Sequence, residues 1–313
     1  MSNTQVQDAY VRRTLLLLRY VNGLQRDANP IIAMLLRDLR GVLLDARPRT
    51  PGDVEALLRV ATREINDAIA KIQTEVDTQL DQLLEVEAGW AADAGNATVA
   101  ADPQALKDAW ASMVVQGAPL SQQWDKLAAA AAFGLGALYR TSAQTGADLA
   151  LALESTAEFA STFVRSVDSL IDTATSTAAY AGRVAVWEAS DTNVLMWHSV
   201  LDSKTTVGCA IRAGLLYDLN LQPINHDTPI DKPPPRHWNC RSILVPMQYP
   251  KGKVPKNGGS DTFAKFLDRQ STDEQNKLLG VGRAEMWRSG TITLSDLIGQ
   301  QGQVLTLGEL RGH

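Results

Sequence analysis

Two cysteines and a histidine are the residues of this sequence best suited to chemistry. The 313 residues include only two cysteines, Cys209 and Cys240. His237 precedes Cys240 by three positions, a spacing that can place both side chains on one metal ion. Asp202 lies shortly before Cys209 and can supply a fourth, oxygen ligand. Zinc accepts such a set of two thiolates, an imidazole and a carboxylate.

The same residues allow interpretations without a metal. Cys209 and Cys240 can be packed thiols, or they can form a bridge that staples the loop between them, although a reducing cytoplasm disfavours a bridge. A catalytic cysteine–histidine pair is a further interpretation. Nucleophilic catalysis needs a positioned third group and an oxyanion site, and the sequence indicates neither. A disulfide-rich secreted scaffold is excluded because it needs more cysteines.

The segment that carries these residues has its own composition. Eight of the 13 prolines lie between Pro223 and Pro255, and residues 201–260 carry eight basic and four acidic side chains. The proline-rich loop ends just before Ile243–Pro246, which has the pattern of a short strand. We expect Trp197 and Trp238, which flank this compact segment, to lie in its core.

The first 200 residues have a different character. They hold 37 of the 41 alanines, with 16 basic and 24 acidic side chains. Apolar residues recur at three- and four-residue steps from Pro51 to about Ala94, which predicts a long amphipathic helix, and 120–190 forms a second helical region. The pairs Asn29-Pro30, Thr50-Pro51 and Asp102-Pro103 each predict a helix start, because proline is tolerated at the first helical position.

Charge and hydropathy limit the function. The net charge of −5 argues against a protein that mainly coats nucleic acid, and no charge-free apolar run of 18 residues predicts a transmembrane helix. The sequence lacks the GxSxG, HExxH and Walker patterns of common hydrolases and nucleotide-binding enzymes, and we expect no enzymatic activity. Lys251, Lys253 and Lys256 are interpreted either as a solvated charged loop or as a local contact with DNA, and Arg236 and Arg241 are further candidates for such a contact.

Two stretches together resemble a known family. Residues 197–206 with Cys209 and Gly214, followed by Pro234-Pro235-Arg236-His237-Trp238-Asn239-Cys240-Arg241-Ser242, resemble the phage head-morphogenesis family typified by the F protein of phage Mu. Its members are also called minor head or minor capsid proteins. The similarity continues through Thr262–Leu267 to Leu305–Leu310, so that it covers about residues 190–310.

The resemblance and the composition together predict the organisation of the chain. The expected fold is mainly α with a small α+β module. A helical, alanine-rich assembly arm covers 1–190, a compact module with the Cys/His motif covers 191–260, and a C-terminal tail that packs on the module covers 261–313.

The resemblance implies a structural role in a tailed phage. Family members associate with the portal and the inner capsid, and aid head assembly or the packaging and delivery of DNA. We therefore expect a virion protein made in the host cytoplasm, present in several copies, with portal and capsid proteins and packaged DNA as partners. The alternatives are a zinc-stapled DNA-binding module and a toxin-type enzyme of the same family.

Overall fold

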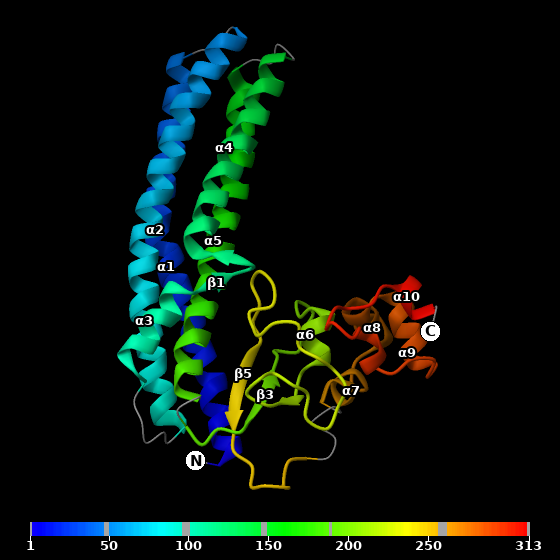
Figure 1. Ribbon diagram of the computed structural model, residues 1–313. Coiled ribbons are helices and arrows are strands. Elements are labelled where there is room, and N and C mark those ends of the chain that lie inside the picture. Colours follow the sequence, from blue (N-terminus) through cyan, green and yellow to red (C-terminus); the bar gives the residue numbers. More distant parts are fainter. Residues whose placement is uncertain are drawn as a thin grey trace. The chain divides into compact units, whose positions relative to one another are not determined.

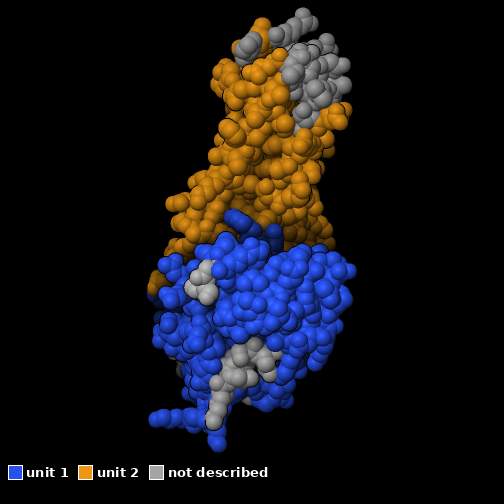
Figure 2. Space-filling model, turned by 90° about the vertical axis from the view of Figure 1, so that its right-hand side faces the viewer, with its two compact units in different colours: residues 1–14, 86–107, 179–313 blue, residues 15–85, 108–178 orange. Residues whose placement is uncertain are grey.

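The chain is mainly α-helical with one small region of mixed helix and strand, as the sequence predicts. The computed structural model describes residues 2–46, 50–95, 101–144, 149–187, 190–255 and 262–311 (Figure 1). The chain divides into two compact units, coloured separately in Figure 2. Unit 1 comprises residues 1–14, 86–107 and 179–313, and unit 2 comprises 15–85 and 108–178. Unit 1 thus joins the predicted module and tail to parts of the predicted arm.

Unit 2 is built from four long helices that run beside one another (Figure 1). Because apolar residues recur every three or four positions, each helix presents one continuous stripe to a shared core. Buried side chains of all four helices meet there, including Leu39, Ile65, Trp124 and Val167. The helices are α1 (Asn3–Ala46), α2 (Pro51–Gly95), α4 (Leu120–Gln144) and α5 (Leu149–Trp187). Among the described residues, no helix has the length and hydropathy needed to cross a bilayer.

A helix and a hairpin connect α2 to α4. Helix α3 (Pro103–Ala111) leads into the antiparallel strands β1 (Val114–Val115) and β2 (Ala118–Pro119). The turn residues Gln116 and Gly117 both have positive φ angles, of 48° and 83°. This is the backbone conformation that tight two-residue hairpins require.

The predicted helix starts at prolines are correct in two of three cases. Helices α2 and α3 begin at Pro51 and Pro103. At the start of α2, the Thr50 hydroxyl accepts from the Asp53 backbone N–H (3.2 Å), and the Asp53 carboxylate accepts from the Thr50 N–H (2.9 Å). This is a reciprocal capping box.

The start predicted at Asn29-Pro30 is wrong, because Pro30 lies inside the unbroken helix α1. Proline removes one backbone hydrogen bond from a helix interior. The buried stripe nevertheless continues across it, with Leu24 and Ala28 before Pro30, and Ile32 and Leu35 after it, in the same core. Tertiary packing therefore outweighs the local cost of the proline.

Unit 1 contains a three-stranded antiparallel sheet of order β4-β3-β5. The central strand β3 (Val194–His198) pairs with β4 (Leu216–Tyr217) and with β5 (Ile243–Met247), so that Met196 faces both Leu216 and Val245. Strand β5 confirms the predicted strand at Ile243–Pro246. The short helix α6 (Val207–Ile211) lies between β3 and β4 in the chain.

The C-terminal part of unit 1 consists of short helices around a second apolar cluster. Phe263, Leu267, Leu279 and Leu297 are buried in it together with Ile211 of α6. The α8 N-cap is Ser271, whose hydroxyl accepts from the Glu274 N–H (3.3 Å). The elements are α7 (Thr262–Leu267), α8 (Thr272–Leu279), α9 (Val281–Arg288), the 3₁₀ turn η1 (Ser295–Leu297) and α10 (Leu307–Arg311).

Within unit 1, a buried carboxylate joins segments of three long helices. Glu87 of α2 is fully buried between two arginines: its Oε1 lies 2.7 Å from Arg13 Nε of α1, and its Oε2 lies 2.8 Å from Arg183 Nε of α5. Both guanidinium groups also lie 5.3 Å from the ring centre of Trp90. A buried carboxylate is tolerated only when it is paired in this way.

Removing a side chain from the core of unit 2 should destabilise the protein far more than the same change on its surface. Leu80 has no exposed surface, whereas Leu15 of the same unit is 58% exposed. We expect Leu80→Ala to cost about 2–5 kcal/mol of unfolding free energy, because the cavity is only partly refilled. Leu15→Ala should change it by less than about 0.5 kcal/mol. Urea denaturation of the two variants measures this, and equal losses would contradict the core assignment.

Candidate metal centre

Two short backbone features position the cysteines and the histidine. Thr206 adopts an extended conformation at the start of α6, and its carbonyl accepts from the Cys209 N–H (3.0 Å), so that Cys209 lies in the first turn. His237 and Cys240 belong to the loop between β4 and β5. There the Cys240 N–H donates to the His237 carbonyl (3.2 Å), in a turn that contains Asn239 at a φ of 56°.

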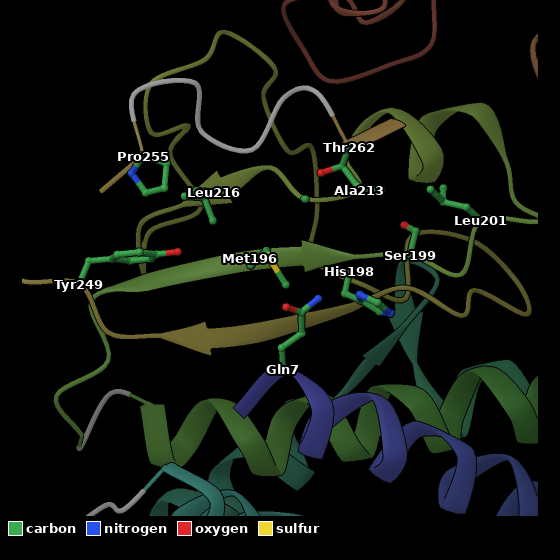
Figure 3. A pocket seen from close by; sticks show the side chains of 11 residues that line it. Gln7, Met196, His198, Ser199, Leu201, Ala213, Leu216, Tyr249, Pro255 and Thr262 are labelled. Carbon is green, nitrogen blue, oxygen red and sulfur yellow. The ribbon is translucent and has the colours of Figure 1, made fainter. Parts of the chain in front are cut away.

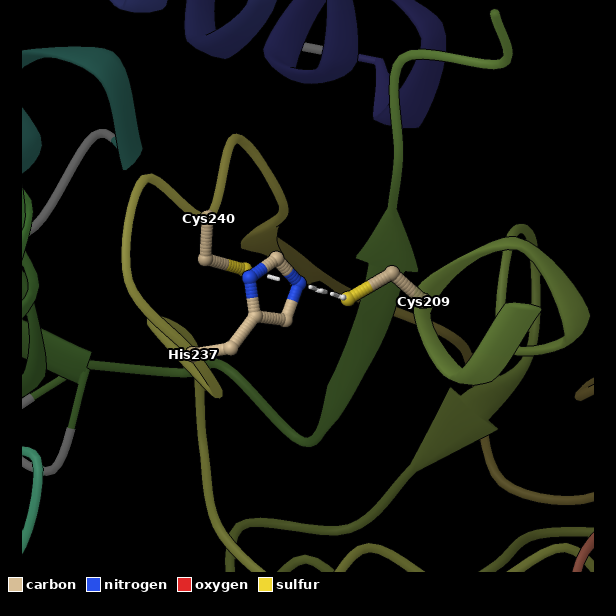
Figure 4. Close-up of side chains that lie close together, drawn as sticks. All are labelled: Cys209, His237 and Cys240. Carbon is tan, nitrogen blue, oxygen red and sulfur yellow. Dashed lines mark hydrogen bonds between the residues drawn. The ribbon is translucent and has the colours of Figure 1, made fainter. Parts of the chain in front are cut away.

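The three side chains converge on one point (Figure 4). Cys209 Sγ lies 3.3 Å from His237 Nε2 and 3.8 Å from Cys240 Sγ. The two sulfurs and a ring nitrogen all lie within 4.8 Å of one another, and both cysteines are buried free thiols while His237 is half-buried. The structure therefore brings together three of the four predicted ligands.

The orientation of the His237 ring is set by its backbone surroundings. Its Nδ1 lies 2.9 Å from the carbonyl oxygen of Trp238, which can only accept a hydrogen bond. In the neutral ring the proton therefore resides on Nδ1, which leaves Nε2, the nitrogen that faces Cys209, as the atom that can accept a hydrogen bond from the thiol or ligate a metal. A histidine that ligates a metal commonly has this second-shell arrangement.

The contacts in the cluster shift the proton affinities of its members. The hydrogen bond with Cys240, and then that with His237, lowers the pKa of the Cys209 thiol far below its usual range. The same contact with Cys209, together with burial, raises the pKa of Cys240. The hydrogen bond to Cys209 also raises the pKa of His237. Hydrogen bonds from its neighbours thus favour ionisation of the Cys209 thiol.

The donor set and its spacing fit zinc. With zinc–sulfur bonds of about 2.3 Å, two thiolates of a tetrahedral site are about 3.8 Å apart, and the two sulfurs here are separated by 3.8 Å. Two sulfurs and an imidazole nitrogen are donors that zinc prefers over the oxygen ligands of magnesium and calcium. The two cysteines therefore already have the spacing of two ligands of one zinc ion.

The structure does not place Asp202 in this cluster, which corrects the prediction of a fourth ligand. Both carboxylate oxygens are bound by Arg241: Oδ2 lies 2.8 Å from its Nη1, and Oδ1 lies 2.6 Å from its Nη2. Asp202 Oδ1 also accepts from the Lys204 N–H (3.0 Å). These bonds hold the pKa of Asp202 far below its usual value, mainly through Arg241. A planar guanidinium matches a carboxylate in this two-point geometry, so Asp202 pins the 201–205 loop beside Cys240.

Arg236 also contributes to the structure of the module. Its guanidinium contacts Asp231 (2.6 Å) and the carbonyl of Gly302 (3.2 Å). Gly208 allows this approach, because a Cβ there would lie 2.7 Å from Arg236 Nη1 and 3.1 Å from a methyl group of Val304. A side chain at residue 208 would therefore displace both the arginine and the C-terminal segment.

Among the described residues that were predicted to contact DNA, Lys251 and Lys253 are exposed. Lys256 lies outside the described residues, and the guanidinium groups of Arg236 and Arg241 are bound to aspartates of the module itself. Trp238, expected in the core, is 43% exposed, whereas Trp197 is fully buried as predicted.

Arg212 is central to this region, although its sequence context suggested no role for it. It is fully buried at the end of α6, and it donates to the carbonyls of Gly208 (2.6 Å), Pro229 (2.7 Å) and Gly302 (2.7 Å). Its guanidinium also lies 5.9 Å from the ring centre of Trp197. The available signal was a single charge within the otherwise apolar segment 207–217, because such a charge must find internal partners.

A cavity of about 460 Å³ lies elsewhere in unit 1, over the sheet. Figure 3 shows Met196 and His198 of β3 lining it together with Gln7 of α1 and Tyr249. Burial lowers the pKa of His198, so that its imidazole is neutral. None of the three cluster side chains lines this cavity.

Comparison of the chain with protein-family models, with curated proteins and with solved structures finds no match.

The loop that delivers His237 and Cys240 is anchored by another histidine, His226. Its Nε2 donates to the Leu216 carbonyl (2.8 Å), and its Nδ1 accepts from the Thr228 N–H (3.2 Å). The ring also packs edge-on against Tyr217, with ring centres 5.0 Å apart. A protonated ring cannot accept from Thr228, and burial lowers the pKa of His226 below 6.5. The fold therefore binds the neutral form.

This arrangement predicts a stability that falls as the pH is lowered. The unfolded chain takes up a proton at His226 near pH 6.5 and the folded chain only at lower pH, so the contribution is intact above pH 6.5 and is lost below it. Between pH 8 and pH 5.5 the wild type should lose more unfolding free energy than His226→Gln, which does not titrate. Denaturant unfolding with chelator present measures this, and identical pH profiles would contradict it.

Proposed function

We propose that this chain is a minor head protein of a tailed phage, a structural component of the virion or procapsid. One observation carries the proposal: the residues that resemble the head-morphogenesis family lie together in space. Cys209 meets His237 and Cys240 across about 30 residues, and Asp202 pairs with Arg241. These contacts support the proposal, because residues that matched the family pattern by chance would have no reason to contact one another.

We further propose that the Cys209–His237–Cys240 cluster holds zinc as a structural staple. When bound, zinc would tie α6 to the loop between β4 and β5, in addition to the buried apolar cluster that both cysteines already join. Burial of the sulfurs favours this role over nucleophilic catalysis, because Cys209 and Cys240 are only 1% and 3% exposed. A nucleophilic cysteine must be accessible to its substrate.

The helices of unit 2 are proposed as the surface that meets the portal or the inner capsid. Several large apolar side chains of this unit are exposed, including Leu15 and Leu16 of α1 and Phe133 of α4, the last at 76%. Exposed apolar side chains are common on any protein, but those at binding surfaces contribute most when a partner buries them. Contact with packaged DNA is assigned to Lys251 and Lys253 rather than to the paired arginines.

Metal analysis tests the zinc proposal. The purified chain should contain one zinc per molecule, and a chelator should lower its melting temperature, because metal binding to the folded state adds to stability. Cys209→Ser and Cys240→Ser should each abolish stoichiometric binding. Asp202→Asn should retain zinc, since Asp202 is bound to Arg241. If the chain contains no zinc and a chelator does not change its melting temperature, the zinc proposal is wrong and the two cysteines are packed thiols.

Particle analysis tests the proposed role. Mass spectrometry of purified procapsids and virions should detect the chain at low copy number, and the portal protein should co-purify with it. Phe133→Asp should weaken this co-purification, because the charge would be buried at the contact. Val281→Asp is the matched control, since Val281 is 58% exposed in unit 1 and lies at a helix start that accepts an acidic residue. Absence of the chain from both particles would overturn the proposal.

A further inference from the structure

The cluster has a buried side and an exposed side. The Cys209–Cys240 contact is buried, whereas Thr206 is exposed and its hydroxyl lies 3.1 Å from His237 Nε2. Nε2 is the nitrogen that faces Cys209 (Figure 4). Thr206 therefore lies on the exposed side of the cluster, next to the metal-binding nitrogen.

The described residues supply three metal-binding side chains and no fourth. Cys209, His237 and Cys240 form the set, and Asp202 is engaged by Arg241 instead. Zinc in structural sites takes four protein ligands, whereas a site with three leaves one position for an external donor. A zinc held by this cluster would therefore have one position left for an external donor.

Charge and softness define the donor that suits this position. Two thiolates and a neutral imidazole balance the charge of Zn²⁺. Arg212, three residues after Cys209, is a buried cation that donates to backbone carbonyls, whereas Arg236 is paired with Asp231. An anionic donor is favoured in the field of this buried cation. Sulfur matches the two thiolates already present, and three cysteines with one histidine form a common zinc set.

Resting on the zinc proposal, we propose that the fourth position of this centre binds a thiolate from outside the chain, with the Thr206 hydroxyl as a positioning group that donates a hydrogen bond to it. The thiolate can belong to a small thiol or to a cysteine of an assembly partner. The centre would then link the module to a thiol-bearing ligand as well as staple its own loop.

Cobalt substitution of the full chain tests this proposal, because Co²⁺ replaces Zn²⁺ and its spectrum reports its ligands. Adding 2-mercaptoethanol should raise the sulfur-to-cobalt charge-transfer absorbance by about half, as two thiolates become three. Azide should produce a weaker effect. A cysteine-containing peptide reproducing the thiol response would show that a protein cysteine can reach the site, and a response to the small thiol alone would assign the position to small thiols.

Variants separate positioning from structural damage. Thr206→Val should weaken thiol binding about fivefold, the loss expected for one hydrogen bond, without changing cobalt stoichiometry. Ser203→Ala, an exposed change in the preceding turn, is the control and should bind thiol normally.

Three outcomes would overturn the inference. A cobalt spectrum that is insensitive to thiol and azide would show a closed site. A changed spectrum in His313→Asn would show that the chain supplies its own fourth ligand; His313 lies outside the described residues. Failure to bind cobalt at all would refute the zinc proposal itself, and with it this one.

Discussion

The compact region depends on the contacts made around one short helix, α6. Cys209 in this helix reaches His237 and Cys240, and Arg212 at its end reaches backbone carbonyls of two distant segments. The helix has only five residues and cannot be stable on its own. Its stability must come from these tertiary contacts, which at the same time fix the positions of the long loop and the C-terminal segment.

Burial of a guanidinium explains why these segments fold as one unit. A charge without solvent must be surrounded by acceptors, and Arg212 finds them at Gly208, Pro229 and Gly302. Glycine at residues 208 and 302 lets the chain come close: a Cβ at Gly302 would lie 2.8 Å from the Asp231 backbone nitrogen. The requirement to satisfy one buried cation therefore holds together backbone groups at residues 208, 229 and 302.

Charge pairing also explains the role of several residues in the segments that resemble the head-morphogenesis family. Asp202, Arg236 and Arg241 appear in the sequence as candidates for ligation or DNA contact, but their charges are used to hold loops in place. Within the part of the chain that the structure describes, only Cys209, His237 and Cys240 combine geometry and donor type for a metal. In the proposed virion role, the module would be a small rigid body held by ion pairs and a metal, and the helices of unit 2 would supply the larger contact surface.

The helix from Pro51 to about Ala94, the strand at residue 243 and the closeness of His237 to Cys240 follow from the sequence alone. Helical periodicity and proline capping act over a few residues, and so does the spacing of His237 and Cys240, so the chain records them directly. Packing settled the rest: Pro30 is spanned by a helix, Cys209 meets His237 and Cys240, Asp202 binds Arg241 rather than joining the sulfurs, and Arg212 is buried. Each of these outcomes depends on which distant residues bury a group or pair with it. Those residues are brought together only by tertiary packing, so no local sequence pattern reveals them.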